Sequence, residues 1–118
     1  MTETTLFLDE VYDLAKTALV KAGASETAAA SVATSTWRAE RDGIRSHGLM
    51  YVPIYAEHVR CGKVIGTAEP QVTHVSAGSV RVDAGYGFAH PAIQTLFDIE
   101  KAESFLSNHY GSIFATVE

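Results

Sequence analysis

The sequence predicts an α+β fold in which three helices come first and a β-hairpin and a fourth helix follow. Two observations support this fold class. Apolar residues recur with helical spacing between Val11 and Val59, and after Gly62 the spacing changes to the alternation that is typical of strands. We therefore divide the chain into a helical segment, residues 1–62, and a mixed segment, residues 63–118.

The first helix is expected between Asp9 and Gly23. The residues with the spacing of an amphipathic helix are Val11, Leu14, Ala15, Ala18, Leu19 and Ala22. Asp9 is expected to cap the N-terminus, because a side-chain oxygen at this position can accept a hydrogen bond from a free backbone N–H. Gly23 is expected to close the helix.

A second helix is expected to begin at Ser25 and to stop at Gly43. One of its faces carries mostly small side chains, namely Ala29, Val32, Ala33 and Thr36. The alanines allow a neighbouring helix to approach closely, while Trp37 supplies one large packing surface whose indole N–H needs a partner. This pattern indicates a helix whose first role is packing.

A third helix is expected to begin between Leu49 and Val52 and to end at Gly62. Its apolar face consists of Leu49, Val52, Ala56 and Val59. Pro53 is tolerated only in the first turn of a helix, which places the start here. The stretch RSHG, residues 45–48, therefore lies just before a helix N-terminus.

A β-hairpin explains the alternation in PQVTHVSAGSVRVDAG, residues 70–85. The first strand alternates Val72 and His74 with Thr73 and Val75, the turn falls at Ala77 and Gly78, and the second strand sets Val80 and Val82 opposite Arg81 and Asp83. Pro91 opens a fourth helix, which is expected to bury Ala92, Ile93, Leu96 and Phe97. The closing stretch, residues 104–118, is expected to be irregular.

Composition argues against several classes of protein. The chain has 14 acidic and 9 basic side chains, and a net charge of -5 repels nucleic acid and anionic lipid. Cys61 is the one cysteine, which excludes an internal disulfide framework and suits a reducing cytoplasm. No basic leader or apolar run of about 20 residues indicates export or a membrane span. We expect a cytoplasmic protein that binds neither nucleic acid nor membrane.

The stretch RSHG has more polarity than a turn between helices requires. A helix N-terminus attracts anions, Ser46 offers a hydroxyl, and His47 can donate or shuttle a proton beside the positive charge of Arg45. This combination would suit a carboxylate. The alternative is that Ser46 caps the helix, His47 packs against it and Gly48 relieves strain. Spacing alone favours the alternative.

Other polar positions carry weaker signals. His109 could act as a general acid or base, although lone histidines are more often satisfied by a backbone carbonyl. The G-x-G at Gly85 and Gly87 lacks a third glycine and a Walker lysine, which favours a plain turn between strand and helix. His90 precedes a proline as an expected cap, and Glu40 to Asp42 form an expected solvated helix end. No metal-binding spacing is present.

An ordered set of motifs does resemble a known family. In chain order the motifs are GAS, ERDGIRSHG, P-x-Y at residues 53–55, GK followed by P, and VDAGYGFAHPA. Together they are similar to the N-terminal part of the malate/L-lactate dehydrogenase family of NAD(P)-dependent oxidoreductases. That family includes ureidoglycolate dehydrogenase and the reductases of piperideine- and pyrroline-2-carboxylate. The resemblance implies a fold distinct from Rossmann, a homodimer, and one truncated domain, residues 1–118, whose part after residue 62 holds the start of the catalytic region.

The resemblance also implies site residues and a reaction. Ser46, His47 and Tyr55 would line the substrate site, and His109 would donate or accept the proton. The implied reaction is reduction of a small 2-oxo or cyclic 2-imino carboxylate by NADH or NADPH, or its reverse. Tyr51 stands where many members carry an arginine that holds the substrate carboxylate, and the segment before His109 is shorter than in the family.

The chain ends at Glu118, before the family segments that complete the cofactor site, so the resemblance assigns no cofactor-binding residue. We expect turnover only if those segments are supplied. One alternative is a non-enzymatic helical module that keeps the family's dimer-forming surface, and another is an unrelated ligand-binding α+β domain. Exposed apolar side chains, Phe97, Phe105 and Phe114 among them, are expected to drive self-association.

Overall fold

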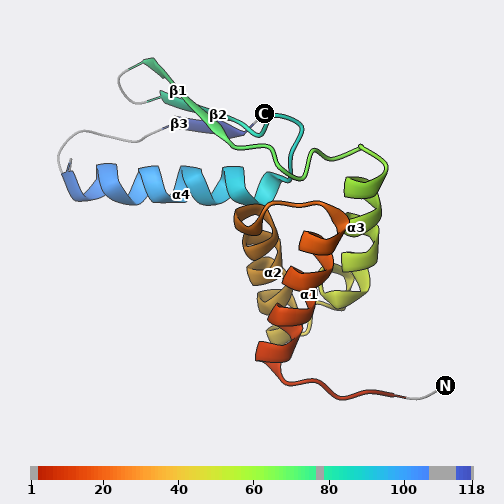
Figure 1. Ribbon diagram of the computed structural model, residues 1–118. Coiled ribbons are helices and arrows are strands. Elements are labelled where there is room, and N and C mark those ends of the chain that lie inside the picture. The colour runs from red at the N-terminus through yellow and green to blue at the C-terminus, as the bar shows by residue number, and fades with distance from the viewer. Residues whose placement is uncertain (1–2, 77–78, 107–113, 118) are drawn as a thin grey trace.

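A computed structural model describes residues 3–76, 79–106 and 114–117 of the chain. Its elements in order are α1 (Leu8–Ala22), α2 (Glu26–Arg41), the 3-10 turns η1 (Arg45–His47) and η2 (Leu49–Tyr51), α3 (Val52–Arg60), β1 (Gln71–Ser76), β2 (Ser79–Asp83), α4 (Ala89–Leu106) and β3 (Phe114–Val117). Figure 1 shows α1, α2 and α3 together, with the strands and α4 as a second group. The predicted fold class is confirmed.

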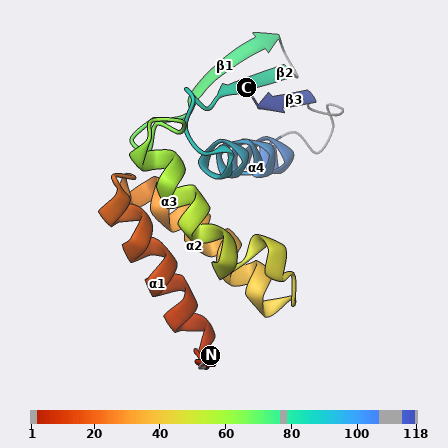
Figure 2. The same ribbon diagram turned by 90° about the vertical axis from the view of Figure 1, so that its right-hand side faces the viewer.

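The three N-terminal helices share a core that is rich in alanine. Its buried members are Ala15, Leu19, Ala24, Ala28, Ala29, Val32, Ala33, Val52, Ala56 and Phe88. Small side chains on α2 allow α1 to pack closely against it, as the sequence predicts, and α3 packs mainly against α1 in the same core. Figure 2 shows the three helices together. The expected small face of α2 is therefore buried within this chain.

The helix ends agree with the sequence except at the starts of α1 and α4, and α4 begins at Ala89 rather than at Pro91. Ser25 Oγ accepts a hydrogen bond from the Ala28 N–H over 3.2 Å, and Gly23 adopts a left-handed φ of 118° after α1. Asp9 is not the cap of α1. The cap is Phe7, whose N–H donates to Glu10 Oε2 over 3.0 Å, because the longer glutamate can reach back to the residue before the helix.

The strands form one sheet in the order β1-β2-β3. β1 and β2 are antiparallel, with Val72 opposite Val82 and His74 opposite Val80, which confirms the predicted hairpin. β3 pairs in parallel with β2, in a stretch that was expected to be irregular. The strand exists because the edge of β2 offers backbone partners, and a sequence pattern does not reveal such pairing.

Helix α4 covers one face of the sheet, and its buried side differs from the prediction. Ala92 packs with Val80 and Val82, and Leu96 lies against the same cluster. Ile93 and Phe97 were expected to be buried but are 43% and 54% exposed. Ile93 and Phe97 directly follow Ala92 and Leu96, which face the sheet, so their side chains point away from it. The side chains of Phe105 and Phe114 lie outside the described residues.

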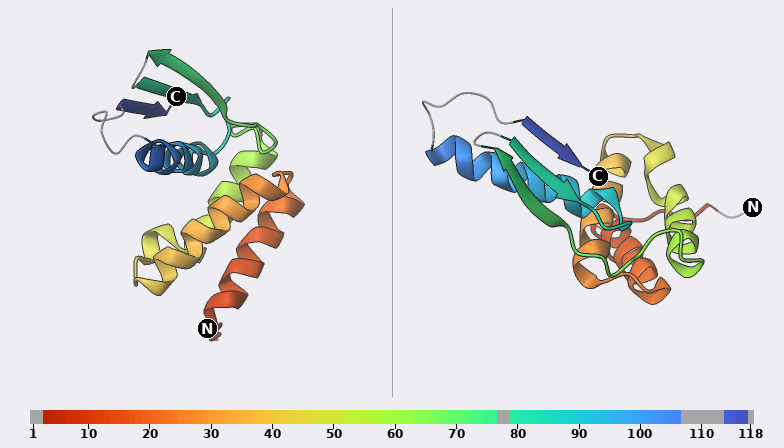
Figure 3. Two further views of the ribbon diagram at one scale, coloured as in Figure 1. Left: turned by 90° about the vertical axis from the view of Figure 1, so that its left-hand side faces the viewer. Right: turned by 90° about the horizontal axis from the view of Figure 1, so that it is seen from above.

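The two groups of elements meet along α2 and α4. Figure 3 shows α4 and the sheet projecting away from the three helices, in a molecule of 57 × 30 × 20 Å. Helix α2 contacts the N-terminal turns of α4. Within the described ranges, no helix is both long and apolar enough to span a membrane.

Candidate substrate site

The Ser46–His47 pair lies in η1, between α2 and α3. Gly43 has a positive φ of 76°, which turns the chain after α2 and leads it into η1. Ser46 Oγ and His47 Nδ1 are 2.9 Å apart, and both side chains are exposed. If the serine hydroxyl donates to Nδ1, the imidazole carries its proton on Nε2, where it can be given to a ligand.

Glu40, rather than Ser46, caps the turn that leads into α3. Its Oε1 accepts a hydrogen bond from the Leu49 N–H over 2.9 Å. A Cβ at Gly48 would overlap the same carboxylate, so glycine is needed there for this approach. The capping interpretation of Ser46 is therefore wrong, and so is the interpretation of Glu40 as part of a solvated helix end. The serine and histidine side chains are left without a capping role.

The neighbours of Glu40 do behave as a solvated helix end. Arg41 and Asp42 form an exposed ion pair with Nε and Oδ1 2.9 Å apart. The Arg41 guanidinium also lies 4.9 Å from the centre of the Trp37 ring. Exposed pairs of this kind contribute little to stability.

Tyr55 lies in a group of four rings. Its ring centre is 4.7 Å from that of Tyr51, 5.6 Å from Phe88 and 5.6 Å from His90. Burial raises the pKa of the Tyr55 hydroxyl, with a smaller contribution from Tyr51. The phenol is therefore neutral near neutral pH and can donate a hydrogen bond. Among the described residues, no hydrogen bond or ring contact joins Tyr55 to the Ser46–His47 pair.

His90 is a residue of this region that the sequence did not indicate as a site residue. It was expected to cap the fourth helix, but α4 begins one residue earlier and the ring packs against Tyr55 and Phe88. Burial lowers the pKa of His90, and its buried Nδ1 has no hydrogen-bond partner among the described residues. The available signal was a histidine among apolar neighbours, from Phe88 to Ala92.

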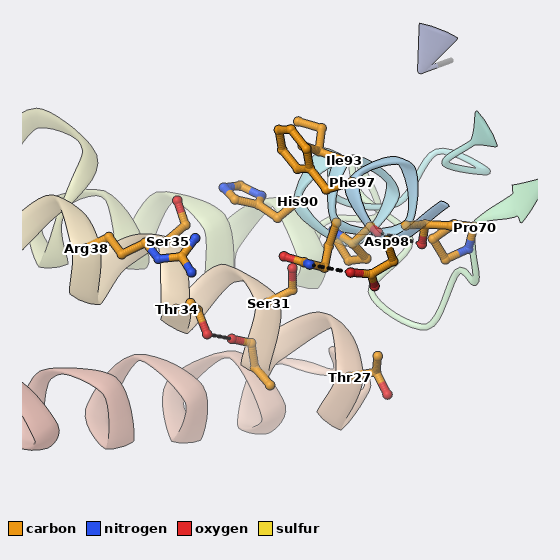
Figure 4. Close-up of a pocket in the computed structure, with 14 residues that line it drawn as sticks. Thr27, Ser31, Thr34, Ser35, Arg38, Pro70, His90, Ile93, Phe97 and Asp98 are labelled. Carbon is orange, nitrogen blue, oxygen red and sulfur yellow. Dashed lines mark hydrogen bonds between the residues drawn. The ribbon is translucent and has the colours of Figure 1, made fainter. Parts of the chain in front are cut away.

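A pocket of about 610 Å³ lies between α2 and α4. Figure 4 shows side chains from both helices and from Pro70 around it, with His90 between the helices. Its lining residues are Thr27, Ala30, Ser31, Thr34, Ser35, Arg38, Pro70, His90, Pro91, Ile93, Gln94, Thr95, Phe97 and Asp98. Ser46, His47 and Tyr55 do not line it.

The glycine-rich loop after β2 is filled by the chain itself. The Ile65 N–H donates to the Tyr86 carbonyl over 2.9 Å, and a Cβ at Gly87 would come within 2.9 Å of the Ala68 Cβ. The loop is a turn between strand and helix, as predicted, and it does not offer the open cradle of backbone N–H groups with which Rossmann-type loops hold a dinucleotide. In the described parts of the chain, no group of three metal-ligating side chains is present. The catalytic candidate His109 lies outside the described residues.

The fold is that of a group of dehydrogenases and reductases of known structure. The crystal structure of Δ1-piperideine-2-carboxylate reductase from Pseudomonas syringae pv. tomato matches 98% of this chain with a TM-score of 0.87 and 31% identity. Malate dehydrogenase from Entamoeba histolytica matches 98% with a TM-score of 0.85 and 20% identity, which shows the shared fold alone. The chain covers 34% and 32% of those two proteins.

The sequence defines the particular family. Residues 7–111 match the malate/L-lactate dehydrogenase family model, so the chain belongs to that family, and the resemblance of its motifs is confirmed. Δ1-Pyrroline-2-carboxylate/Δ1-piperideine-2-carboxylate reductase from Pseudomonas putida is 36% identical over 92% of this chain. (2R)-3-Sulfolactate dehydrogenase (NADP(+)) from Chromohalobacter salexigens is 42% identical over 73%. The chain spans 35% and 26% of the lengths of these relatives.

Proposed function

We propose that this chain contributes one wall of the substrate site of an oxidoreductase. The reaction would be hydride transfer between NADH or NADPH and a small 2-oxo or cyclic 2-imino carboxylate, or its reverse. Family membership and the names of the relatives support this reaction class. The observation that carries the proposal is the exposed Ser46–His47 pair, 2.9 Å apart, beside a turn that Glu40 already caps.

The chain's own residues would bind the substrate and hold a proton. Ser46 and His47 provide a hydroxyl and a ring N–H for a carboxylate, and Tyr55 provides a neutral phenol. His109 is proposed as the proton donor or acceptor. Tyr51 brings no charge where many family members carry an arginine, and we therefore expect weak affinity for the carboxylate.

The cofactor is proposed from the family. One relative carries NADP(+) in its name, and the choice between NAD and NADP stays open here. Because the glycine-rich loop after β2 is filled by the chain itself, we assign none of its residues to the cofactor.

The setting of the protein is also part of the proposal. We propose a cytoplasmic homodimer in which residues 1–118 are one truncated domain of a longer protein. The match to 35% of the length of the P. putida reductase supports the truncated-domain part of this proposal.

The test is an assay of the chain joined to the remaining segments of a family member. NADH and NADPH oxidation is followed with pyruvate, oxaloacetate and piperideine-2-carboxylate. We expect His109→Ala to lower kcat by about 10²-fold or more, and Ser46→Ala and His47→Gln to raise KM by about tenfold each. His74→Gln, on an exposed position of β1, is the matched control. Absence of turnover with every substrate, or full activity of the Ser46 and His47 variants, would refute the proposal.

A second candidate is a non-enzymatic dimerisation or interaction module derived from the family. The small face of α2 no longer supports it, because that face is buried in the core that this chain forms mainly with α1. The exposure of Ile93 and Phe97 on α4 does favour it. The assay of the joined protein separates the two candidates, since the Ser46→Ala and His47→Gln variants would leave KM unchanged if this chain were only a module.

A further inference from the structure

The pocket between α2 and α4 has a polar side and an apolar side, and the proposed function uses neither. Arg38, Ser35 and Ser31 contribute polar groups from α2. Ile93 and Phe97 contribute apolar surface from α4 (Figure 4). A volume of about 610 Å³ is within the usual range for a small-molecule site.

The three polar residues of α2 share one helix face and lack partners in the described parts of the chain. They occupy positions i, i+4 and i+7, which lie in line along a helix. Arg38 forms no ion pair there, whereas Arg41 pairs with Asp42. The hydroxyls of Ser31 and Ser35 make no hydrogen bond there either, unlike the threonines of the same pocket, Thr34 and Thr95, which bond to backbone carbonyls.

His90 adds a donor from the opposite side. Since orphaned buried N–H groups are rare, its buried and unpartnered Nδ1 is best kept as the unprotonated ring nitrogen. Burial also lowers the pKa of His90, which keeps the ring neutral near neutral pH. The single ring proton then lies on Nε2, which is not among the buried unpartnered atoms and can donate to an occupant of the pocket.

We propose that this pocket binds a small monocarboxylate with an apolar body. The carboxylate lies against Arg38 and the two serine hydroxyls and accepts a hydrogen bond from His90. The apolar body lies on Ile93 and Phe97. An arginine without an acidic partner is the charge complement of such a ligand. Asp98, which accepts a 3.0 Å hydrogen bond from Gln94, lines the same pocket and disfavours an ion of higher charge such as phosphate.

The test is carried out on the 118-residue chain. The probe is benzoate, and its neutral counterpart benzamide is the control ligand. Binding is measured by calorimetry and by the shifts of backbone N–H signals in NMR spectra. We expect benzoate to shift Ser31, Ser35 and Gln94 and to bind at least about tenfold more tightly than benzamide. Arg38→Gln should weaken the binding of benzoate by at least about tenfold, whereas Arg60→Gln, outside the pocket, should leave the affinity unchanged.

Four results would overturn the proposal. The first is equal binding of benzoate and benzamide, and the second is benzoate affinity that Arg38→Gln leaves unchanged. The third is a set of shifts confined to Ser46 and His47, which would place the carboxylate at the other site. Thermal melting shows whether Arg38→Gln still folds, and Ser35→Ala provides a second variant with a smaller expected loss. Phosphate competing as well as benzoate would also count against a monocarboxylate site.

Discussion

The Glu40 carboxylate accepts a hydrogen bond from the Leu49 N–H and lies where a side chain at position 48 would be. This contact links the end of α2 to the beginning of α3. It also determines which groups of the turn are available to a ligand, because Glu40 performs the capping that Ser46 was expected to perform. At the scale of single residues, the candidate site therefore depends on a glutamate and a glycine that have no chemical role in it.

Gly48→Ala tests this contact. The new methyl group must displace Glu40, and we expect a loss of about 1–3 kcal/mol in the free energy of unfolding. Glu40→Ala should lower the free energy of unfolding by about 1 kcal/mol, because it removes the cap. Urea unfolding measures both. In the double variant the two losses should not add, since each disrupts the same contact. Full additivity would show that Gly48 and Glu40 act independently.

His90 should make stability depend on pH. Burial lowers its pKa in the folded state, whereas in the unfolded chain the ring titrates near its ordinary value of 6.5. As the pH falls below that value, the unfolded state takes up a proton first, so the free energy of unfolding decreases. We expect His90→Gln to reduce the stability difference between about pH 7.5 and about pH 5.5. His74→Gln, on exposed β1, should leave that difference unchanged, and an equal effect of both variants would contradict the assignment.

Helix α2 is the element that joins packing to candidate function. Its alanine face lies in the core with α1 and α3, while Ser31, Ser35 and Arg38 face the pocket beside α4. One helix can do both because its faces repeat every 3.6 residues. Changes on the two faces should therefore affect different properties of the protein.

Ala33→Leu tests the packing face of α2. Ala33 is fully buried, and a larger side chain there should separate the helices and lower the free energy of unfolding by about 1–3 kcal/mol. Thr17→Leu, on the exposed side of α1, should change it by less than about 0.5 kcal/mol. Guanidinium unfolding measures both variants. If Ala33→Leu were neutral, close packing of these helices would not explain the alanines.

The whole molecule leaves apolar surface uncovered where α4 projects from the three helices (Figure 3). Ile93 and Phe97 lie on the side of α4 that does not face the sheet. Exposed apolar area of this kind marks interaction surfaces or promotes self-association. Among the described residues, Ile93 and Phe97 therefore offer one surface for the predicted self-association, beside other exposed apolar side chains such as Phe7 and Met50.

Replacing this surface should reduce self-association. We expect the purified chain to be oligomeric or poorly soluble, and the double variant Ile93→Asn, Phe97→Ser to shift it toward the monomer, because less apolar area is left to bury. Light scattering over a range of concentrations measures the change. Leu14→Ser removes an equally exposed side chain from α1 and should have little effect. A monodisperse monomer of the unchanged chain would contradict the expectation.

Local patterns were sufficient for some features and not for others. Ser25, Gly23 and Gly62 were correctly placed at helix ends, because caps and left-handed turns depend on neighbours in the sequence. Ile93 and Phe97 were wrongly placed in the core, because the orientation of α4 is set by the sheet beneath it. The roles of Ser46, His47, Tyr55 and His109 came from family resemblance and stay predictions.

The sequence by itself determined the order and most boundaries of the helices, the hairpin and the family. These depend on apolar periodicity, turn residues and an ordered set of motifs along the chain. Tertiary structure alone decided that Glu40 caps the turn before α3, that His90 packs on Tyr55, that β3 joins β2 and that α2 and α4 enclose a pocket. The physical reason is that each of these contacts joins residues far apart in the sequence, where local spacing carries no information about distance or direction.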